Sequence, residues 1–310
     1  HPFIEELRQA KKTIRQLSAR NAVIDPQKGR HYFTQNPFGT LTGRNSAWGA
    51  LFAGPKWNRW LLTSSWPADD EQVLVSADIK HQEPAIAAML SGDPDMIYVT
   101  EGSDAHWGLG VQMGLVRPCK NPKNRPERDM FKIVNLAVLY GMSKYGLADS
   151  LGVGVEEADR LLKIHRRTFP QYWRWSEDCL DQYTSGFAFT RHGWRAKTEG
   201  RINTFKNFAV QGGAADQMRL IVTHLDQQGV CLRAIIHDGF LMTCPRKRLG
   251  DLREAFQVAL DLATRQFHPT FKCQFDFDVY DWRYADPKGR LMWDHIQSTL
   301  TNIYGETING

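Results

Sequence analysis

The chain has 310 residues, enough for one large domain or two small ones, and its hydrophobic content of 42% allows a sizeable core. It contains no run of about 18 apolar residues, which excludes a predicted membrane span. The 39 Lys and Arg residues exceed the 34 Asp and Glu residues by only five, but the basic residues are clustered, which favours a local contact with an anionic partner. Five cysteines without a CxxC pair indicate free thiols in a reducing intracellular compartment.

The chain begins at His1 rather than Met, so we expect it to be a fragment of a longer protein. Residues 3–20 predict an amphipathic helix, since apolar residues recur at helical spacing between charged ones. Residues 29–44 are rich in turn-forming, aromatic and β-branched residues, which is typical of short strands joined by loops. This segment ends in Thr42-Gly43-Arg44, and a lone arginine in a loop is usually solvated.

The stretch VLVSADIKHQEPAIAAML, residues 73–90, predicts a strand followed by a helix. An apolar run ends on Asp78, and Glu83 and Pro84 then begin an alanine-rich helix, where proline is tolerated in the first turn. A carboxylate at the end of a buried strand is costly unless something cationic meets it. A helix stop follows at residues 90–94, and residues 95–115 predict further helix interrupted by glycines.

Residues 117–132 are basic and broken by three prolines, which predicts a loop leading into a helix over residues 128–141. On that helix Arg128, Lys132, Leu136 and Tyr140 recur every four residues, with Asn135 between them.

A four-residue step drifts by only about 40° in an α-helix, so these five side chains should follow one slowly winding stripe. Cations near the start of the helix and a flat ring at its end suit a ligand with a polyphosphate tail and a flat base. A buried helix whose Arg and Lys side chains reach solvent explains the same spacing.

Residues 147–169 predict a second helical region with a break at residues 152–154 and a basic end over residues 160–167. The aromatic residues at positions 172, 173 and 175 should be part of the core. Residues 190–195 predict a hairpin, and residues 201–225 predict a long helix. That helix carries Asn207 and Gln211, neighbours on one face, and amides can both donate to and accept from base edges and sugars.

Residues 231–244 predict a hairpin, because two apolar runs flank His237-Asp238-Gly239 and place an acid at the tip. Residues 249–267 predict an amphipathic helix, and residues 271–279 alternate as a strand. The tail over residues 280–310 gives no prediction. Two carboxylates at strand ends, Asp78 and Asp238, are typical of a divalent metal site that acts on phosphate.

Three stretches, in this order, resemble motifs A, B and C of the family A DNA polymerases. Motif A resembles Asp78 with Glu83 five residues later, and motif C resembles His237-Asp238. Motif B resembles R-x3-K-x2-N-x4-YG, here from Arg128 to Gly141. A TGR signature precedes motif A at residues 42–44, and N-x3-QG followed by AAD lies between motifs B and C from residue 207. Each signature is weak alone, but five in the family's order make a strong signal.

The resemblance implies an α+β polymerase right-hand fold with an antiparallel-sheet palm, a helical fingers subdomain and a thumb that is reduced or absent. We expect a thumb-adjacent helix over residues 1–20 and palm with motif A over 21–95. The fingers with motif B should cover 96–204, and 205–310 should hold palm with motif C and a C-terminal tail. A proofreading exonuclease is not expected in this chain.

The resemblance also implies roles at the site for two-metal phosphoryl transfer with Mg²⁺, or Mn²⁺ in its place. The expected catalytic residues are Asp78, Asp238 and Lys132. The expected metal ligands are Asp78, Asp238 and the backbone carbonyl of Ile79. The expected nucleotide contacts are Arg128, Lys132, Leu136, Tyr140, Glu83 and Ile79. The expected DNA contacts are Arg44, Asn207, Gln211 and His237.

The chain departs from the family pattern at four positions. Motif C reads HDG where HDE is usual, and Leu136 stands where the family has an aromatic residue against the sugar. Tyr98 stands about where a nucleotide-contacting histidine is common. The hairpin over residues 190–195 resembles T-x-x-G-R-R, with Trp194 in place of the first arginine. The middle of motif A also differs, which leaves the role of His81 open.

The expected partners are a primed DNA template and a dNTP, with no membrane. Additional domains or replication proteins are further expected partners, and the chain is expected to be a monomer. The expected location is the cytoplasm or nucleoid of a bacterium or phage host. Three other functions remain open: a single-subunit RNA polymerase, a non-catalytic DNA-binding relic and a metal-dependent hydrolase. Glu83 argues against the first, because RNA polymerases of that kind keep a small residue there.

Overall fold

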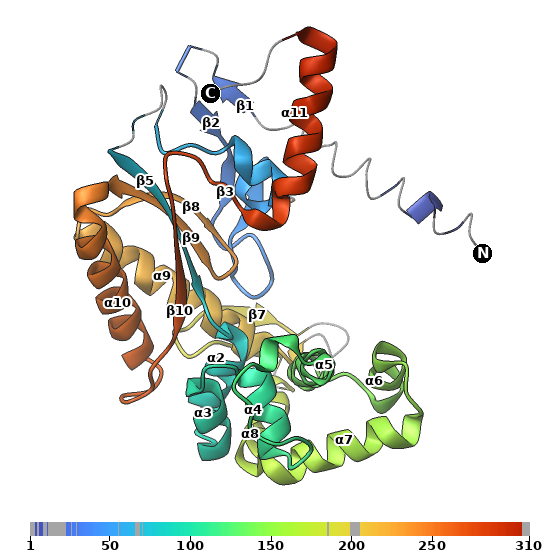
Figure 1. Ribbon diagram of the computed structural model, residues 1–310. Helices are drawn as coiled ribbons and strands as arrows, with labels where there is room; N and C mark the ends of the chain where they lie inside the picture. The colour runs from blue at the N-terminus through green and yellow to red at the C-terminus, as the bar shows by residue number, and fades with distance from the viewer. Residues whose placement is uncertain are drawn as a thin grey trace.

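The structure is a computed structural model, shown in Figure 1. It describes residues 4, 6–8, 11, 23–25, 27–28, 30–54, 56–65, 69, 71–184, 186–198 and 205–305. Most of the helix predicted over residues 1–20 therefore lies outside the described residues, although residues 4, 6–8 and 11 are helical. Among the described helices, none has both the length and the apolar character needed to cross a bilayer.

A four-stranded antiparallel sheet organises the molecule, with strand order β10–β5–β9–β8. The strands are β5 (Gln72–Ile79), β8 (Cys231–Ile236), β9 (Gly239–Pro245) and β10 (Phe275–Tyr280). The hairpin predicted over residues 231–244 is confirmed as β8 and β9. The last predicted strand is confirmed but begins at residue 275 rather than 271.

β5 is an inner strand of the sheet, and a hydrophobic cluster covers each of its two faces. Val73 and Val75 face the main core, which they share with Phe240 of β9, whereas Leu74 faces a second cluster that contains Tyr284. Successive side chains of a strand point to opposite faces, so a strand covered on both sides reads as a nearly continuous apolar run. Asp78, at the end of this run, is exposed.

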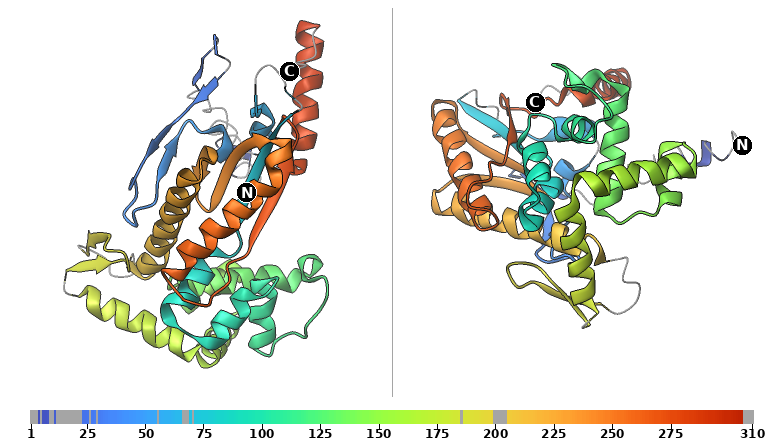
Figure 2. Two further views of the ribbon diagram at one scale, coloured as in Figure 1. Left: turned by 90° about the vertical axis from the view of Figure 1, so that its left-hand side faces the viewer. Right: turned by 90° about the horizontal axis from the view of Figure 1, so that it is seen from below.

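Two long helices, α9 (Phe208–Gln227) and α10 (Leu249–Arg265), pack against each other and against the sheet (Figures 1 and 2). The predicted α10 is confirmed. The prediction that α9 begins at residue 201 is wrong for the described residues, because residues 205–207 form a turn. Phe205 is buried beside Tyr183 and Phe208 in a separate aromatic cluster, and this packing turns the chain before the helix begins.

A group of shorter helices lies at one end of the sheet (Figure 1). Its members are α2 (Gln82–Ser91), α3 (Pro94–Glu101), α4 (Ala105–Gln112), α5 (Pro126–Leu139), α6 (Lys144–Leu151), α7 (Val155–Thr168) and α8 (Pro170–Tyr183). Gly92 and Gly152 have φ values of 65° and 66°, which confirms the predicted helix stops. The stretch predicted as helix over residues 95–115 is two helices, because Asp104 caps a new one.

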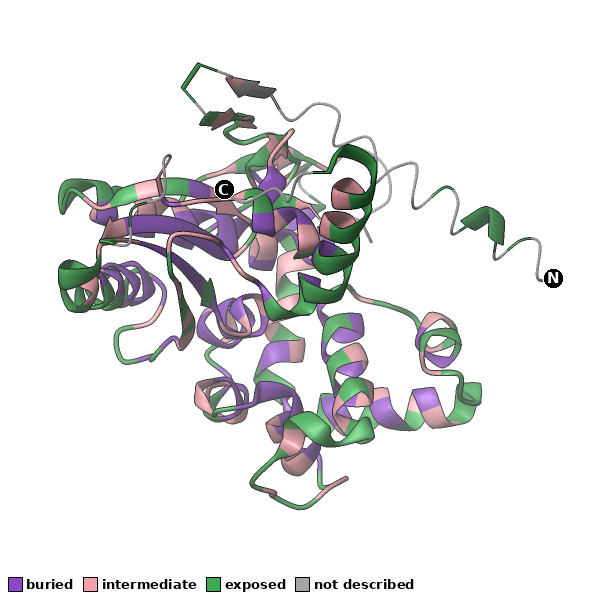
Figure 3. Ribbon diagram, turned by 45° about the horizontal axis from the view of Figure 1, so that its top comes forward, coloured by how far each residue is buried: buried purple, intermediate pink, exposed green. Residues whose placement is uncertain are grey.

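Buried residues lie on the inner faces of these helices, while residues on their outer faces are exposed (Figure 3). Tyr172 is buried and Trp173 and Trp175 pack against the core, which confirms their predicted place.

Short hairpins and turns complete the described fold. The hairpin strands are β1 (Val23–Asp25), β2 (Arg30–Tyr32), β3 (Thr34–Asn36), β4 (Ser46–Trp48), β6 (Phe187–Phe189) and β7 (Arg195–Lys197). The 3-10 turns are η2 (Leu51–Ala53), η3 (Lys56–Leu61), η4 (Pro122–Asn124), η6 (Arg246–Arg248) and η7 (Pro287–Gly289). A final helix, α11 (Arg290–Tyr304), lies in the tail for which we made no prediction, and Trp293 stacks on Trp60.

Candidate active site

Two carboxylates meet where β5 ends and the β8–β9 hairpin turns. Asp78 lies directly across from Gly239 in the register of β5 and β9, and Asp238 precedes that glycine in the turn. The backbone N–H of Ile79 donates to the carbonyl oxygen of Asp238 at 3.1 Å, which ties the strand end to the turn. The two acids, 160 positions apart in the chain, are thus held together at one end of the two inner strands of the sheet.

The electrostatics of this pair fit a divalent cation. Burial and the neighbouring Asp238 carboxylate raise the pKa of Asp78 from 3.8 to about 6, although its side chain reaches solvent. Burial also raises the pKa of Asp238 above its usual range. In the described part of the chain, no ion pair satisfies either carboxylate, and no group of three or more acidic, His or Cys side chains could hold a metal. A pair of carboxylates is what Mg²⁺ uses when its remaining ligands are water and substrate phosphates.

α5 presents the stripe that motif B predicts, with one exception. Lys132, Leu136 and Tyr140 are exposed along one side of the helix, and Tyr140 lies just beyond its last residue. The prediction that Asn135 shares this stripe is wrong, because Asn135 is buried with 2% of its surface exposed. Asn135 comes one residue before Leu136, so a turn of about 100° points it into the core.

Arg128 lies at the start of this stripe and is held by a carboxylate. Its Nε donates to Asp104 Oδ2 at 2.6 Å, and Asp104 also caps α4. His106 follows in the first turn of α4, and its ring lies 4.8 Å from that of His81 in an edge-to-face contact. Burial lowers the pKa of His106 to about 3, so it is neutral near pH 7.

His106 was not among the residues predicted from the sequence, where Tyr98 instead stood at the place of a common family histidine. Tyr98 is 74% exposed. The Asp104-x-His106 pattern carried the signal, since an N-cap acid marked the true start of α4.

Glu83 is the hub of a hydrogen-bonded network that joins four of the predicted site residues. Its Oε1 is 2.6 Å from Nη2 of Arg44, and its Oε2 accepts from Nδ2 of Asn207 at 3.0 Å. The Tyr140 hydroxyl donates to Oε1 at 3.4 Å and accepts from Nε2 of Gln211 at 2.7 Å. Motifs A and B, the TGR signature and the start of α9 therefore converge on one carboxylate.

The remaining predicted residues surround this network or lie apart from it. His237 is exposed with a φ of 57° and, together with Arg44, lines a cavity of about 230 Å³ beside α9. The basic end of α7 is less available than its sequence suggested. Three of its cations form ion pairs with nearby acids: Arg160 with Glu157, Lys163 with Asp159 and Arg166 with Glu177.

The family of the chain follows from a comparison with protein-family models. The model described as DNA polymerase family A matches residues 2–279. The chain belongs to this family. The sequence is 28% identical over 279 residues to the thermostable DNA polymerase I of Thermus aquaticus, covering 80% of this chain and 32% of that protein. It is 29% identical over 258 residues to DNA polymerase I of Deinococcus radiodurans, covering 76% of this chain and 26% of that protein.

The family A fold is also found among solved structures. The polymerase domain of Pol1 from M. smegmatis, solved with a DNA primer-template and dNTP, superposes with a TM-score of 0.75 and 22% sequence identity. The match covers 92% of this chain and 53% of that one. The predicted α+β right-hand fold is therefore confirmed. The chain spans about a third or less of the length of the two curated family A relatives.

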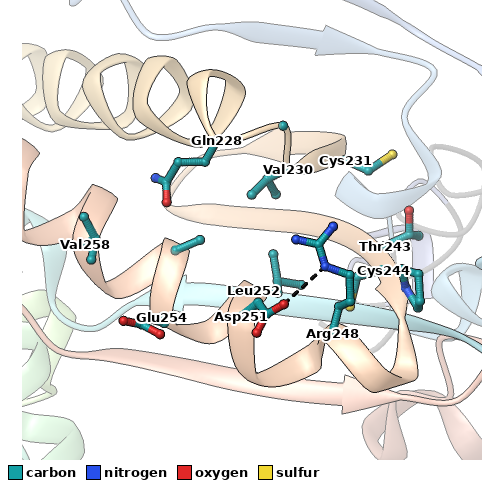
Figure 4. Close-up of a pocket in the computed structure, with 13 residues that line it drawn as sticks. Gln228, Val230, Cys231, Thr243, Cys244, Arg248, Asp251, Leu252, Glu254 and Val258 are labelled. Atoms are coloured by element: carbon teal, nitrogen blue, oxygen red, sulfur yellow. Dashed lines mark hydrogen bonds and ion pairs between the residues drawn. The ribbon is translucent and has the colours of Figure 1, made fainter.

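A second cavity of about 410 Å³ lies outside the region where the family A motifs converge (Figure 4). Arg248 and Asp251, whose side chains form an ion pair, lie on its wall together with Cys231 and Thr243. It opens at the end of β9 that is opposite Gly239, so it does not belong to the site around Asp78 and Asp238.

Proposed function

We propose that the chain is a DNA-directed DNA polymerase that adds dNTPs to a primer 3′ end on a DNA template. One observation carries this proposal. The backbone N–H of Ile79, the residue after Asp78, donates to the carbonyl oxygen of Asp238 and so keeps the two strand-end acids near each other, and Glu83, four residues beyond Ile79, contacts side chains from three further signatures. A non-catalytic relic has no need to hold two mutually repelling carboxylates together, because their repulsion only costs stability.

In this proposal Asp78, Asp238 and the backbone carbonyl of Ile79 hold two divalent ions, Mg²⁺ or Mn²⁺ in its place. Such ions lower the pKa of the attacking primer hydroxyl and stabilise the charge on the transferred phosphate. The protein's part is to keep both carboxylates ionised and aligned for the α-phosphate. Gly239 helps, since a Cβ at this position would lie only 3.3 Å from Asp78 Oδ1.

The side of α5 with the exposed stripe binds the incoming nucleotide. Lys132 is exposed and reaches the triphosphate, where it neutralises charge and donates a proton to the leaving pyrophosphate. Arg128 keeps one edge of its guanidinium on Asp104, which fixes the plane of the fork and leaves its other N–H groups for phosphate oxygens. Tyr140 and Leu136 border the base and sugar.

Glu83 excludes ribonucleotides by occupying the space beside the 2′ carbon of the sugar. Its three neighbours fix its rotamer, so the carboxylate cannot swing away to admit a hydroxyl. Arg44, Asn207, Gln211 and His237 contact the primer end and the growing duplex, where Arg44 and the amides can read groove edges without sequence preference.

In this proposal the palm covers residues 21–95 and 205–310, and the fingers cover residues 96–204. The first experiment is a gel-based primer-extension assay on one template, with dNTPs or rNTPs and with or without Mg²⁺. We expect extension with dNTPs that needs the metal and is lost in Asp238→Asn. The matched control is Asp278→Asn, an exposed acid of β10, which should extend normally. Preferential use of rNTPs would favour an RNA polymerase, and no extension by the wild type would remove the proposal.

A further inference from the structure

Phe38, in the turn before the TGR signature, contacts a tryptophan and an arginine through its ring. Trp194 of the β6–β7 hairpin stacks on it with ring centroids 4.8 Å apart and an interplanar angle of 22°. The guanidinium of Arg219, from α9, lies 4.2 Å from the centroid of the same ring. Phe38 has a φ of 57°, a left-handed conformation that is unfavourable for a bulky residue, so the surroundings must stabilise it.

The same two side chains also bind the backbone of the loop over residues 37–44. Nε1 of Trp194 donates to the carbonyl oxygen of Leu41 at 3.0 Å, and Nη1 of Arg219 donates to that of Gly43 at 2.7 Å. Gly43 has a φ of 73°, and a Cβ there would lie 3.1 Å from the Trp194 ring. The loop is therefore fixed at two carbonyls, one on each side of Thr42.

Asp216 of α9 anchors this arrangement in the folded core. One carboxylate oxygen accepts from Nη2 of Arg219 at 3.0 Å, and the other accepts from the hydroxyl of Thr190 at 2.8 Å. Thr190 in turn accepts the backbone N–H of Trp194 at 3.1 Å. Asp216 and Thr190 are buried. Trp194 and Arg219, the two residues that hold the loop, are therefore both connected to α9 through the Asp216 carboxylate.

A half-exposed aromatic ring between cations is typical of a platform on which nucleic-acid bases stack. The Phe38 ring is already engaged within the protein, because Trp194 stacks on it and the Arg219 guanidinium lies over it. Its role must therefore be to hold the loop itself.

The loop carries Arg44 to Glu83. The loop closes on itself through the N–H of Arg44, which donates to Thr40 Oγ1 at 2.9 Å, and the N–H of Thr40, which donates to the Arg44 carbonyl at 3.2 Å. Nη2 of Arg44 then lies 2.6 Å from Glu83 Oε1.

We propose that Trp194 and Arg219 are positioning residues for sugar selection: they hold the loop over residues 37–44 so that Arg44 fixes the carboxylate of Glu83. This inference rests on the proposed function, in which Glu83 excludes the 2′-hydroxyl.

The test measures the ratio of kcat/KM for dATP and ATP on one primed template, in the full chain. Trp194→Ala removes both the stack and the N–H donor, and we expect its preference for dATP to fall by about tenfold, the lower end of what packing discrimination can supply. Trp194→Phe keeps the stack and should retain most of the preference. Tyr304→Ala removes an exposed aromatic residue of α11 and should match the wild type.

A double variant separates positioning from general damage. If Trp194 acts through Glu83, adding Trp194→Ala to Glu83→Ala should change the dATP to ATP ratio by less than about twofold, because contacting sites in one network are not additive. A general loss of structure would lower kcat for both nucleotides and leave the ratio unchanged. An unchanged ratio in Trp194→Ala, or equal effects with and without Glu83, would overturn the inference.

Hydrogen exchange distinguishes this failure from failure of the proposed function. In Trp194→Ala the amides of Gly43 and Arg44 should exchange at least about tenfold faster than in the wild type, with α10 unchanged. Unchanged exchange would show that Trp194 does not hold the loop. If exchange rises but the wild type extends no primer, the proposed function fails and the selectivity role fails with it, whereas the loop contact itself stands.

Discussion

Replacing Asp78 with asparagine should stabilise the metal-free protein at neutral pH, because burial and the neighbouring Asp238 carboxylate both disfavour the charged form of Asp78. The pKa of Asp78 is raised from 3.8 to about 6, by burial first and Asp238 second, with Asp276 adding to the rise and Arg59 and Lys56 opposing it. This is roughly two pK units at about 1.36 kcal/mol each, an upper limit near 3 kcal/mol. Asp78 reaches solvent, so screening reduces the effect to about 1–2 kcal/mol.

The sign of the pH dependence follows from the proton count. The unfolded chain loses the Asp78 proton near pH 3.8, whereas the folded chain keeps it to about pH 6. Between these values the folded state binds more protons, so the stability of the wild type falls as pH rises. Asparagine does not titrate. The variant should therefore equal the wild type at pH 4 or below, apart from the side-chain exchange itself, and exceed it fully above pH 6.

Thermal unfolding in a chelator, at several pH values from 4 to 8, measures this difference. We expect Asp78→Asn to melt roughly 2–6 °C above the wild type at pH 7.5, and Asp278→Asn to track the wild type throughout. Adding Mg²⁺ should raise the melting temperature of the wild type and not that of Asp78→Asn, because a bound ion stabilises only the folded state. A variant that melts lower at pH 7.5, or a difference independent of pH, would refute the raised pKa of Asp78.

Three further predictions concern substrates. Lys132→Ala should raise KM for dNTP and lower kcat in steady-state primer extension, because a cation on the triphosphate acts in both ground and transition states; unchanged values would leave the helix stripe without a nucleotide role. Glu83→Ala should improve the use of ATP relative to dATP by about 10–200-fold in kcat/KM, the range that packing can discriminate, and an unmoved ratio would reduce Glu83 to a helix-start acid. The logarithm of the binding constant for duplex DNA should fall with the logarithm of the salt concentration, with a slope of about −0.9 per phosphate contact. Replacing Lys120 and Lys123 by alanine should make this slope, measured by fluorescence anisotropy, less steep. An unchanged slope would mean that these cations are merely solvated.

The sequence predicted the fold well where a local period fixes the structure. The apolar run of β5 and the HDG turn between two further apolar runs located both acids, since a strand end and a hairpin tip are recognisable from neighbouring residues alone. The four-residue period of α5 likewise located Lys132, Leu136 and Tyr140 on one side. The prediction for Asn135 was wrong because each residue turns the helix by about 100°, so the residue before Leu136 points away from the exposed side and into the core.

The contacts that the sequence could not predict join segments far apart in the chain. The residues near Glu83 in the sequence do not predict that Arg44 and Asn207, which are 39 and 124 positions away, bind its carboxylate. The stacking of Trp194 on Phe38 could not be predicted for the same reason. From the sequence, the tryptophan at position 194 was only a departure from the family pattern. Such pairs depend on how the helices and sheet pack, which no local period encodes.

The glycine of the HDG motif acquires a physical meaning in the register of the sheet. Gly239 is buried directly across from Asp78, and a Cβ on it would meet Asp78 Oδ1 at 3.3 Å and Cγ at 3.7 Å. Burial and the Asp238 carboxylate already raise the pKa of Asp78 to about 6, so a third carboxylate at this position would add repulsion and make the metal-free fold less stable at neutral pH. Glycine therefore limits the repulsion to two charges and leaves the Asp78 oxygen unobstructed. On this argument, the HDG motif should lower the cost of holding Asp78 and Asp238 together without removing either acid from the site.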